Sequence, residues 1–303
     1  MTTSSSENAI RSRLRHFQRL RAVRSAKSTL RAARQIGPLV WRLATSRHRA
    51  LPDLMIVGAQ KAGTTQLFAS MARHPACFAA LKKEVQYFSK QANRSVSWYR
   101  SHFALQRTVQ RAGGVTFEAT PSYLPSPAAL KQMHATVPGA KVVVLLRDPV
   151  SRAFSHYQHY KTRQLETRSF AQAVDEILRD RPIDFAERWL AEPNADPLYD
   201  YVARGYYALQ LQALWRLYDS QNTLVMDSSE LFADTDAATQ RVFDFVGLRR
   251  FPVPPKKVYN IGHYREKIGP EVAVRLREHY EAHDQELAKL LGQPLSWMKR
   301  SAA

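Results

Sequence analysis

A run of small, cationic and hydroxyl residues follows an apolar segment near the start of the folded part of the chain. Residues 58–65 read Gly-Ala-Gln-Lys-Ala-Gly-Thr-Thr and come directly after the apolar residues 54–57. Two glycines five positions apart allow the backbone to curl so that successive N–H groups point inward, and the start of a helix adds partial positive charge. We expect this loop to bind an anion, with the amine of Lys61 held over it.

A second group of such residues follows another apolar segment, 141–146. Nucleotide triphosphate loops place a lysine after the second glycine, and their partner strand carries an aspartate that holds Mg²⁺. Here Thr64 takes the place of that lysine, and the second strand ends in Arg147. A guanidinium binds phosphate well but cannot ligate a metal, and Ser155, two helical turns further on, can donate its hydroxyl to the same anion. These residues predict an anionic nucleotide site without a metal.

The elements that must position these side chains alternate along the chain. Apolar runs predict strands at 54–57, 115–118, 141–146 and 223–226. Helical patterns are expected at 64–73, 127–136, 149–162, 170–178, 206–218, 237–245 and 270–291. Continuous apolar strands that alternate with helices are typical of a parallel sheet covered on both faces. We therefore predict an α/β fold of three layers, similar to P-loop proteins, with a central parallel sheet flanked by helices.

The composition is that of an ordinary globular protein. The chain has 303 residues, of which 45% are hydrophobic and 23% charged, so collagen-like and wholly disordered classes are excluded. A single cysteine cannot form an internal disulfide, and no apolar run approaches the roughly 18 residues of a membrane helix. We expect a cytoplasmic protein, either free or in peripheral contact with the inner face of the membrane.

The first 50 residues carry much of the positive charge. They hold twelve Lys or Arg and one acid, which is 12 − 1 = +11 of the chain's net charge of +19. Four apolar residues recur there at helical spacing: Ile10, Leu14, Phe17 and Leu20. An amphipathic basic helix suits an anionic membrane surface, although a solvated tail or a helix packed on its own domain fits as well. We predict a basic arm over 1–50, partly helical or disordered, and one domain over 51–303.

The two motifs resemble those of a known enzyme family. Residues 56–65 look like the 5′-phosphosulfate loop of sulfotransferases that use 3′-phosphoadenosine 5′-phosphosulfate (PAPS), and Arg147-Asp148-Pro149 with Arg152 and Ser155 looks like their 3′-phosphate motif. The likeness is strongest to the heparan-sulfate branch and its bacterial relatives. It implies PAPS as co-substrate, no metal, and donor contacts from these residues: Gln60, Lys61, Ala62, Gly63, Thr64, Thr65, Arg147, Ser155, Gly262, Tyr264 and Arg265.

The same resemblance implies roles in catalysis. Lys61 stabilises the leaving phosphate, and Glu84 removes the acceptor proton. His159 matches a histidine of the N-sulfating members, although a packed or exposed helix histidine fits equally. The acceptor, a carbohydrate, glycolipid or other small molecule, is expected to contact these residues: Glu84, Tyr123, Tyr206 and Tyr207. At helical spacing Tyr207 fits a core position as well.

Two departures from the family pattern bear on the acceptor. Gln86 stands where the glycosaminoglycan enzymes often have a histidine, and Ala119 stands where several members have a catalytic lysine. Two other functions remain as alternatives. A P-loop kinase would require Mg²⁺ and a lysine after Gly63, and a nucleic-acid-binding protein would use the basic arm with steep salt dependence. No specific nucleic acid is expected as a partner.

Overall fold

The computed structural model describes residues 38–180, 200–253 and 266–299. Contacts along the chain divide it into two units, residues 1–47 and residues 48–303. Of the first unit the described part holds a short helix at 38–44. The sheet and the residues predicted to form the site belong to the second unit.

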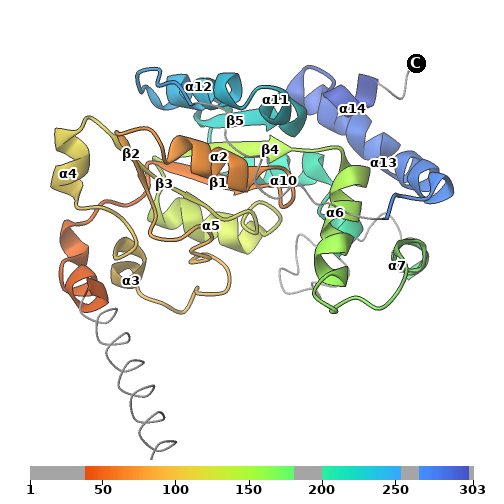
Figure 1. Cartoon of the computed structure of the whole chain (residues 1–303), viewed down its shortest axis with the longest axis horizontal. Helices are drawn as coiled ribbons and strands as arrows, with labels where there is room; N and C mark the ends of the chain where they lie inside the picture. Colours follow the sequence, from red (N-terminus) through yellow and green to blue (C-terminus); the bar gives the residue numbers. More distant parts are fainter. Residues whose placement is uncertain (1–37, 181–199, 254–265, 300–303) are drawn as a thin grey trace, which may run out of the picture. The chain divides into compact units, whose positions relative to one another are not determined.

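Five parallel strands form the central sheet of the second unit (Figure 1). They are β1 (Leu54–Gly58), β2 (Cys77–Ala79), β3 (Val115–Ala119), β4 (Lys141–Leu146) and β5 (Thr223–Asp227). Their order across the sheet is β2-β3-β1-β4-β5, and each neighbouring pair is parallel. β1 is buried along its whole length because both faces of the sheet are covered. The predicted parallel sheet is confirmed.

In the described part of the chain, seven helices have eight or more residues, and they lie around the sheet or at one end of it. They are α2 (Thr64–Met71), α5 (Pro127–Thr136), α6 (Pro149–Lys161), α7 (Phe170–Asp180), α10 (Tyr207–Trp215), α12 (Thr235–Val246) and α13 (Pro270–Leu291). Shorter helices are η1 (Ser46–His48), α3 (Val96–Arg100), α4 (Gln106–Arg111), α9 (Asp200–Ala203), η3 (Ser220–Asn222), α11 (Ser228–Ala233) and α14 (Ser296–Lys299).

The long helices form a layer on each face of the sheet. The connection from β1 to β2 runs along the sheet in the opposite direction to the connection from β3 to β4. Because parallel crossovers are right-handed, α2 and α5 must lie on opposite faces. α12 packs against α2, whereas α10 packs against both α5 and α13. The predicted three-layer arrangement is therefore confirmed.

A second apolar cluster fixes α6 at one end of the sheet. It joins α6, α7, α9 and α13, and these helices gather on one side in Figure 1. Val150 and Tyr157 of α6 contribute to it together with Tyr201 and Tyr280. α6 begins with Asp148 as its N-cap, whose carboxylate accepts from the Val150 N–H at 3.2 Å, and with Pro149 in the first turn. The helix that carries Ser155 and His159 is thus fixed at its start and along one side.

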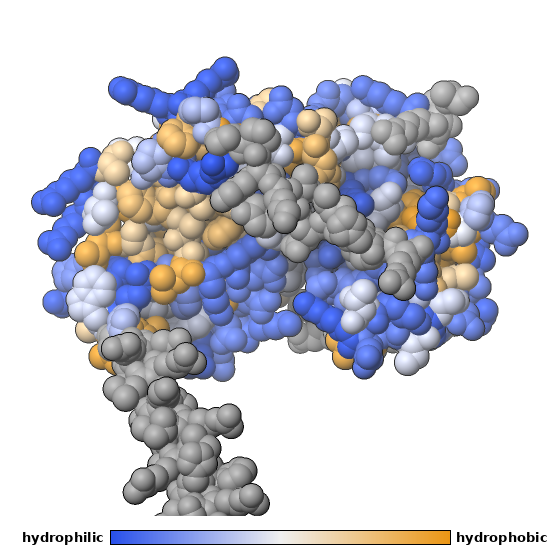
Figure 2. Space-filling model, viewed as in Figure 1, coloured by the Kyte–Doolittle hydropathy of each residue, from blue (hydrophilic) through white to orange (hydrophobic). Residues whose placement is uncertain are grey.

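The predicted elements agree with the observed ones to within a few residues, and the omissions are short. β2 has three residues, and only Cys77 is buried, so no periodicity marks it. The short helices α3, α4, α9, α11 and α14 also carried no signal in the sequence. Hydrophilic residues cover most of the face shown in Figure 2, with an apolar patch around α2 and β2. No helix among the described residues is long and apolar enough to cross a membrane.

Candidate active site

The loop between β1 and α2 ends in an uncapped helix N-terminus. The Ala59 N–H donates to the Leu145 carbonyl at 2.6 Å, which ties the start of the loop to β4. Gly63 occupies the N-cap position with φ 95° and offers no side chain to cap the helix. The first N–H groups of a helix have no partner within it and carry partial positive charge, so Thr64 and Thr65 present N–H groups suited to an anion.

The cationic end of β4 meets this loop. The Arg147 guanidinium donates through Nη1 to the Lys61 carbonyl at 2.9 Å. The Arg147 carbonyl in turn accepts from the Tyr207 hydroxyl at 2.8 Å, which connects the strand end to α10. The structure therefore brings the two predicted motifs together, because adjacent parallel strands end at the same edge of the sheet.

The amine of Lys61 lies within a group of positive charges. Burial lowers its pKa first, and the charges of Arg147, Arg163 and Arg152 lower it further, while Glu84 acts in the opposite direction. A second arginine braces the loop, since Arg204 donates from Nη1 to Gln60 Oε1 at 2.6 Å. The positive charges of these arginines and of Lys61 repel one another, and an anionic ligand would reduce that repulsion.

Glu84 lies beside the end of β3 and acts on the same group of charges. Its backbone N–H donates to the Ala119 carbonyl at 3.0 Å, which places the residue beside the strand. Its carboxylate accepts from Lys83 Nζ at 2.9 Å and from Gln86 Nε2 at 3.4 Å, and the side chain is 43% exposed. A half-exposed carboxylate that acts electrostatically on Lys61 is available to an incoming acceptor.

α6 supplies the remaining predicted residues. Ser155 is buried, and His159 follows one turn later on the same face. His159 Nε2 lies 2.6 Å from Arg163 Nη1. Burial lowers the pKa of His159, and Lys61 and Arg163 lower it further, so the imidazole is neutral near pH 7. From the sequence no role was predicted for Arg163, although it stands four residues after His159, a spacing that could have pointed to it, and no specific contact for Arg204.

The three tyrosines expected to contact the acceptor are buried in the structure. Tyr123, Tyr206 and Tyr207 are 0%, 6% and 1% exposed. The Tyr123 hydroxyl accepts from the Phe88 N–H at 3.4 Å, and Tyr206 lies 2.7 Å from His279 Nε2 through its hydroxyl. All three side chains pack into the protein in this structure, and their contact with an acceptor stays a prediction. The expected nucleotide contacts Gly262, Tyr264 and Arg265 lie outside the described residues.

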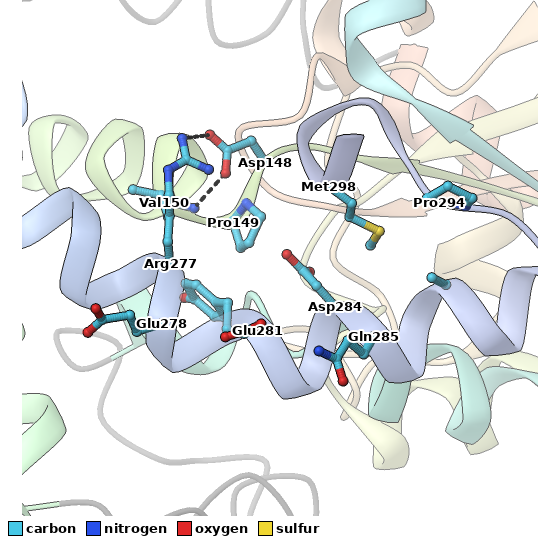
Figure 3. A pocket seen from close by; sticks show the side chains of 12 residues that line it. Asp148, Pro149, Val150, Arg277, Glu278, Glu281, Asp284, Gln285, Pro294 and Met298 are labelled. Atoms are coloured by element: carbon cyan, nitrogen blue, oxygen red, sulfur yellow. Dashed lines mark hydrogen bonds and ion pairs between the residues drawn. The ribbon is translucent and has the colours of Figure 1, made fainter. Parts of the chain in front are cut away.

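A cavity lies beside the end of β4, between α6, α13 and α14 (Figure 3). It measures about 670 Å³, and its wall carries the carboxylates of Asp148, Glu278, Glu281 and Asp284 against one cation, Arg277. Burial raises the pKa of Asp284 to about 7. An excess of carboxylates repels a polyanion, so the Lys61 side is better suited to bind an anion than this cavity. Among the described residues no group of three His, Cys, Asp or Glu could hold a metal ion.

The chain is similar to known proteins over most of its length. The family model named "Sulfotransferase domain" matches residues 51–283. Heparan sulfate glucosamine 3-O-sulfotransferase 6 from Homo sapiens is 28% identical over 273 residues, covering 82% of this chain and 74% of that protein. Bifunctional heparan sulfate N-deacetylase/N-sulfotransferase 4 from Mus musculus is 25% identical, covering 82% of this chain and 31% of that protein. The sulfotransferase structure from Alicyclobacillus acidocaldarius is 25% identical with a TM-score of 0.63, and the match covers 82% of this chain and 99% of that chain.

Proposed function

The chain belongs to the sulfotransferase domain family, and we propose that it moves a sulfuryl group from PAPS to a hydroxyl or amine of a carbohydrate acceptor. That it is a sulfotransferase follows from the family, which spans most of the folded unit. The donor, the acceptor and the residue roles are the proposal. The contact between Arg147 and the Lys61 carbonyl carries it, because it joins the two predicted anion-binding motifs in one place.

The donor half of the site is assigned to the loop, α2 and the end of β4. PAPS supplies a sulfuryl group bonded through oxygen to its 5′-phosphate, with adenosine 3′,5′-bisphosphate as the second product. Lys61 and the N–H groups of Thr64 and Thr65 bind the 5′ end, and Lys61 stabilises the charge that develops on the departing oxygen. Arg147 and Ser155 bind the 3′-phosphate, which distinguishes PAPS from ATP.

The acceptor half of the site is assigned to Glu84 and the residues facing it. Glu84 takes the proton from the acceptor O–H or N–H while the new bond to sulfur forms and the bond from sulfur to the 5′-phosphate oxygen breaks. His159 and Arg163 face the same region from α6. The named activities of the relatives, O- and N-sulfation of heparan sulfate, support a carbohydrate acceptor, and their similar identities to this chain favour neither atom.

Calorimetry and a transfer assay test this proposal. We expect adenosine 3′,5′-bisphosphate to bind equally well with and without Mg²⁺ and more tightly than ATP. Radiolabelled PAPS incubated with a panel of glycans should label at least one of them. A metal-dependent preference for ATP would instead support the kinase alternative.

A substitution at Glu84 tests the base. Glu84→Gln should lower kcat by about 100-fold or more, the usual contribution of a general base, and leave bisphosphate affinity unchanged. Asp244→Asn on α12 removes an exposed carboxylate elsewhere and serves as the control. Full activity of Glu84→Gln would assign the proton transfer to another group.

We also propose that the basic arm brings the enzyme to an anionic bilayer surface. The described helix at 38–44 exposes apolar side chains, with Leu39 at 46%, Val40 at 57% and Trp41 at 52%, next to a stretch of high positive charge. Exposed apolar side chains beside arginines suit a headgroup layer. Flotation should show binding to phosphatidylcholine vesicles that contain phosphatidylglycerol, weakened in the double variant Leu39→Ser/Val40→Ser. Equal binding to pure phosphatidylcholine vesicles, or none to either, would contradict this proposal.

A further inference from the structure

A buried acid lies directly behind Glu84 and has no role in the site described above. Glu118 is the fourth residue of β3 and is 0% exposed. Its carboxylate accepts from the Tyr99 hydroxyl at 2.7 Å and from Thr120 Oγ1 at 3.1 Å. The Val85 N–H and the Tyr123 hydroxyl also form hydrogen bonds with it. These four donors and the carboxyl form one hydrogen-bonded network.

The network holds the backbone on which Glu84 stands. The Glu84 N–H donates to the Ala119 carbonyl at 3.0 Å, and the next N–H along the chain, that of Val85, donates to the Glu118 carboxylate. Further along, the Gln86 N–H donates to Thr120 Oγ1 at 3.4 Å.

The last contact of this kind joins the Phe88 N–H to the Tyr123 hydroxyl at 3.4 Å. Four backbone N–H groups between residues 84 and 88 thus donate hydrogen bonds to acceptors in residues 118–123. A strand end that accepts from each of them sets the position of the whole segment.

The segment needs this support because its conformation is unusual. Glu84 has φ 62° and Gln86 has φ 59°, and both lie in the left-handed region that residues with a side chain rarely adopt. Such residues persist where the surrounding structure determines their conformation. Val85, between them, is fully buried, so its side chain and its N–H both point into the protein while Glu84 remains half-exposed.

We infer that Glu118, together with Thr120, is a positioning residue for Glu84: it fixes the segment 84–88 so that the Glu84 carboxylate faces the acceptor. The inference rests on the proposed role of Glu84 as the base. Glu118 cannot itself take the acceptor proton, because it is fully enclosed. Burial raises its pKa to about 7, although its hydrogen-bond donors act in the opposite direction.

Thr120 offers the cleanest substitution for a test. Its hydroxyl bridges Glu118 Oε2 and the Gln86 N–H. Thr120→Val keeps the shape and removes that hydroxyl, whereas Thr120→Ser retains it and should restore the wild-type behaviour. Thr239→Val is the matched control, because Thr239 is equally buried, in α12, and donates within its own helix to the Thr235 carbonyl.

Hydrogen–deuterium exchange of the ligand-free protein gives a result that does not depend on the reaction. Thr120→Val should speed exchange of the N–H groups at 84–88 by about fivefold or more, the loss of roughly one hydrogen bond, with Thr120→Ser and Thr239→Val unchanged there. Unchanged exchange at 84–88 in Thr120→Val would overturn the inference whatever the substrate is.

Kinetics complete the test. If the base is displaced, Thr120→Val should lower kcat by about tenfold to 100-fold, with bisphosphate affinity and donor KM unchanged. The alkaline and acid limbs of its kcat profile should shift relative to wild type, which a purely structural loss would not cause. Faster exchange with wild-type kcat would also overturn the inference. Failure of the proposed function is recognised separately, because the wild-type enzyme would then neither bind bisphosphate nor use PAPS.

Discussion

Replacing Arg147 by methionine should separate its two contacts from each other. In the structure its guanidinium donates to the Lys61 carbonyl at 2.9 Å, and the proposal adds a contact to the 3′-phosphate of the donor. The first contact supports the loop and affects every ligand bound there. The second exists only for a ligand that carries a 3′-phosphate, so two ligands that differ in that group distinguish the two contacts.

The magnitudes follow from the kinds of hydrogen bond involved. Loss of the contact to the neutral Lys61 carbonyl should weaken both ligands by about 1 kcal/mol, or roughly fivefold. Loss of a charge-assisted contact to phosphate is worth about 1.5–3 kcal/mol, or roughly 10- to 150-fold, and falls on the bisphosphate alone. Arg147→Met should therefore weaken adenosine 5′-monophosphate about fivefold and adenosine 3′,5′-bisphosphate at least tenfold more than that.

Isothermal calorimetry of both ligands at one ionic strength measures these losses. Arg250→Met removes a charge from an exposed ion pair with Asp244 and controls for the change in net charge. Equal losses for the two ligands would show that Arg147 acts only on the loop. No loss for either would place the nucleotide elsewhere and refute the reasoning.

Three further outcomes are expected. Tyr207→Phe removes the donor to the Arg147 carbonyl and should lower the free energy of unfolding in urea by about 1 kcal/mol, with weaker bisphosphate binding; unchanged stability and affinity would contradict the support role. The lowered pKa of Lys61 means that its positive charge is lost at a lower pH than for an ordinary lysine, so calorimetry should show bisphosphate affinity falling on the alkaline side earlier than in Lys61→Arg. Because the pKa of Glu118 is raised from 4.5 to about 7, unfolding releases its proton between those values, and this group should lower stability by up to about 3 kcal/mol from pH 4.5 to pH 7. In urea melts Glu118→Gln should remove this contribution and leave that of Asp284, whose pKa is also raised to about 7.

The strands and helices could be predicted from the sequence where their segments are long and apolar or have clear ends. β4 is predicted at the bounds observed, because five aliphatic residues in a row after Lys141 leave little alternative to a buried strand. α13 is also predicted at its observed bounds, between Pro270 in its first turn and Gly292 at its end. β2 was missed, since three residues at the edge of the sheet create no pattern that differs from a loop.

The site was predictable in its charges and less so in its aromatic residues. Lys61 and Arg147 were placed together because the ends of adjacent parallel strands meet at one edge. The tyrosines at 123, 206 and 207 were predicted to contact the acceptor; the structure buries all three, and that contact stays a prediction. An aromatic ring at helical spacing fits a cleft or a core equally, and only the packing of other elements decides between them.

Backbone conformation explains why the arrangement around Glu84 could not be foreseen. Within the described residues, four that carry side chains have positive φ: Lys61, Glu84, Gln86 and Gln164. A left-handed conformation costs about 1–2 kcal/mol for such a residue, so local preference argues against each of them. Gly63 adopts the same left-handed conformation at little cost, and a glycine is the residue type from which such a conformation can be predicted. The conformations at 84 and 86 are instead set by acceptors more than 30 positions away, at 118–120. The two groups proposed to do the chemistry, the amine of Lys61 and the carboxylate of Glu84, thus both stand on backbone that only the folded sheet can hold.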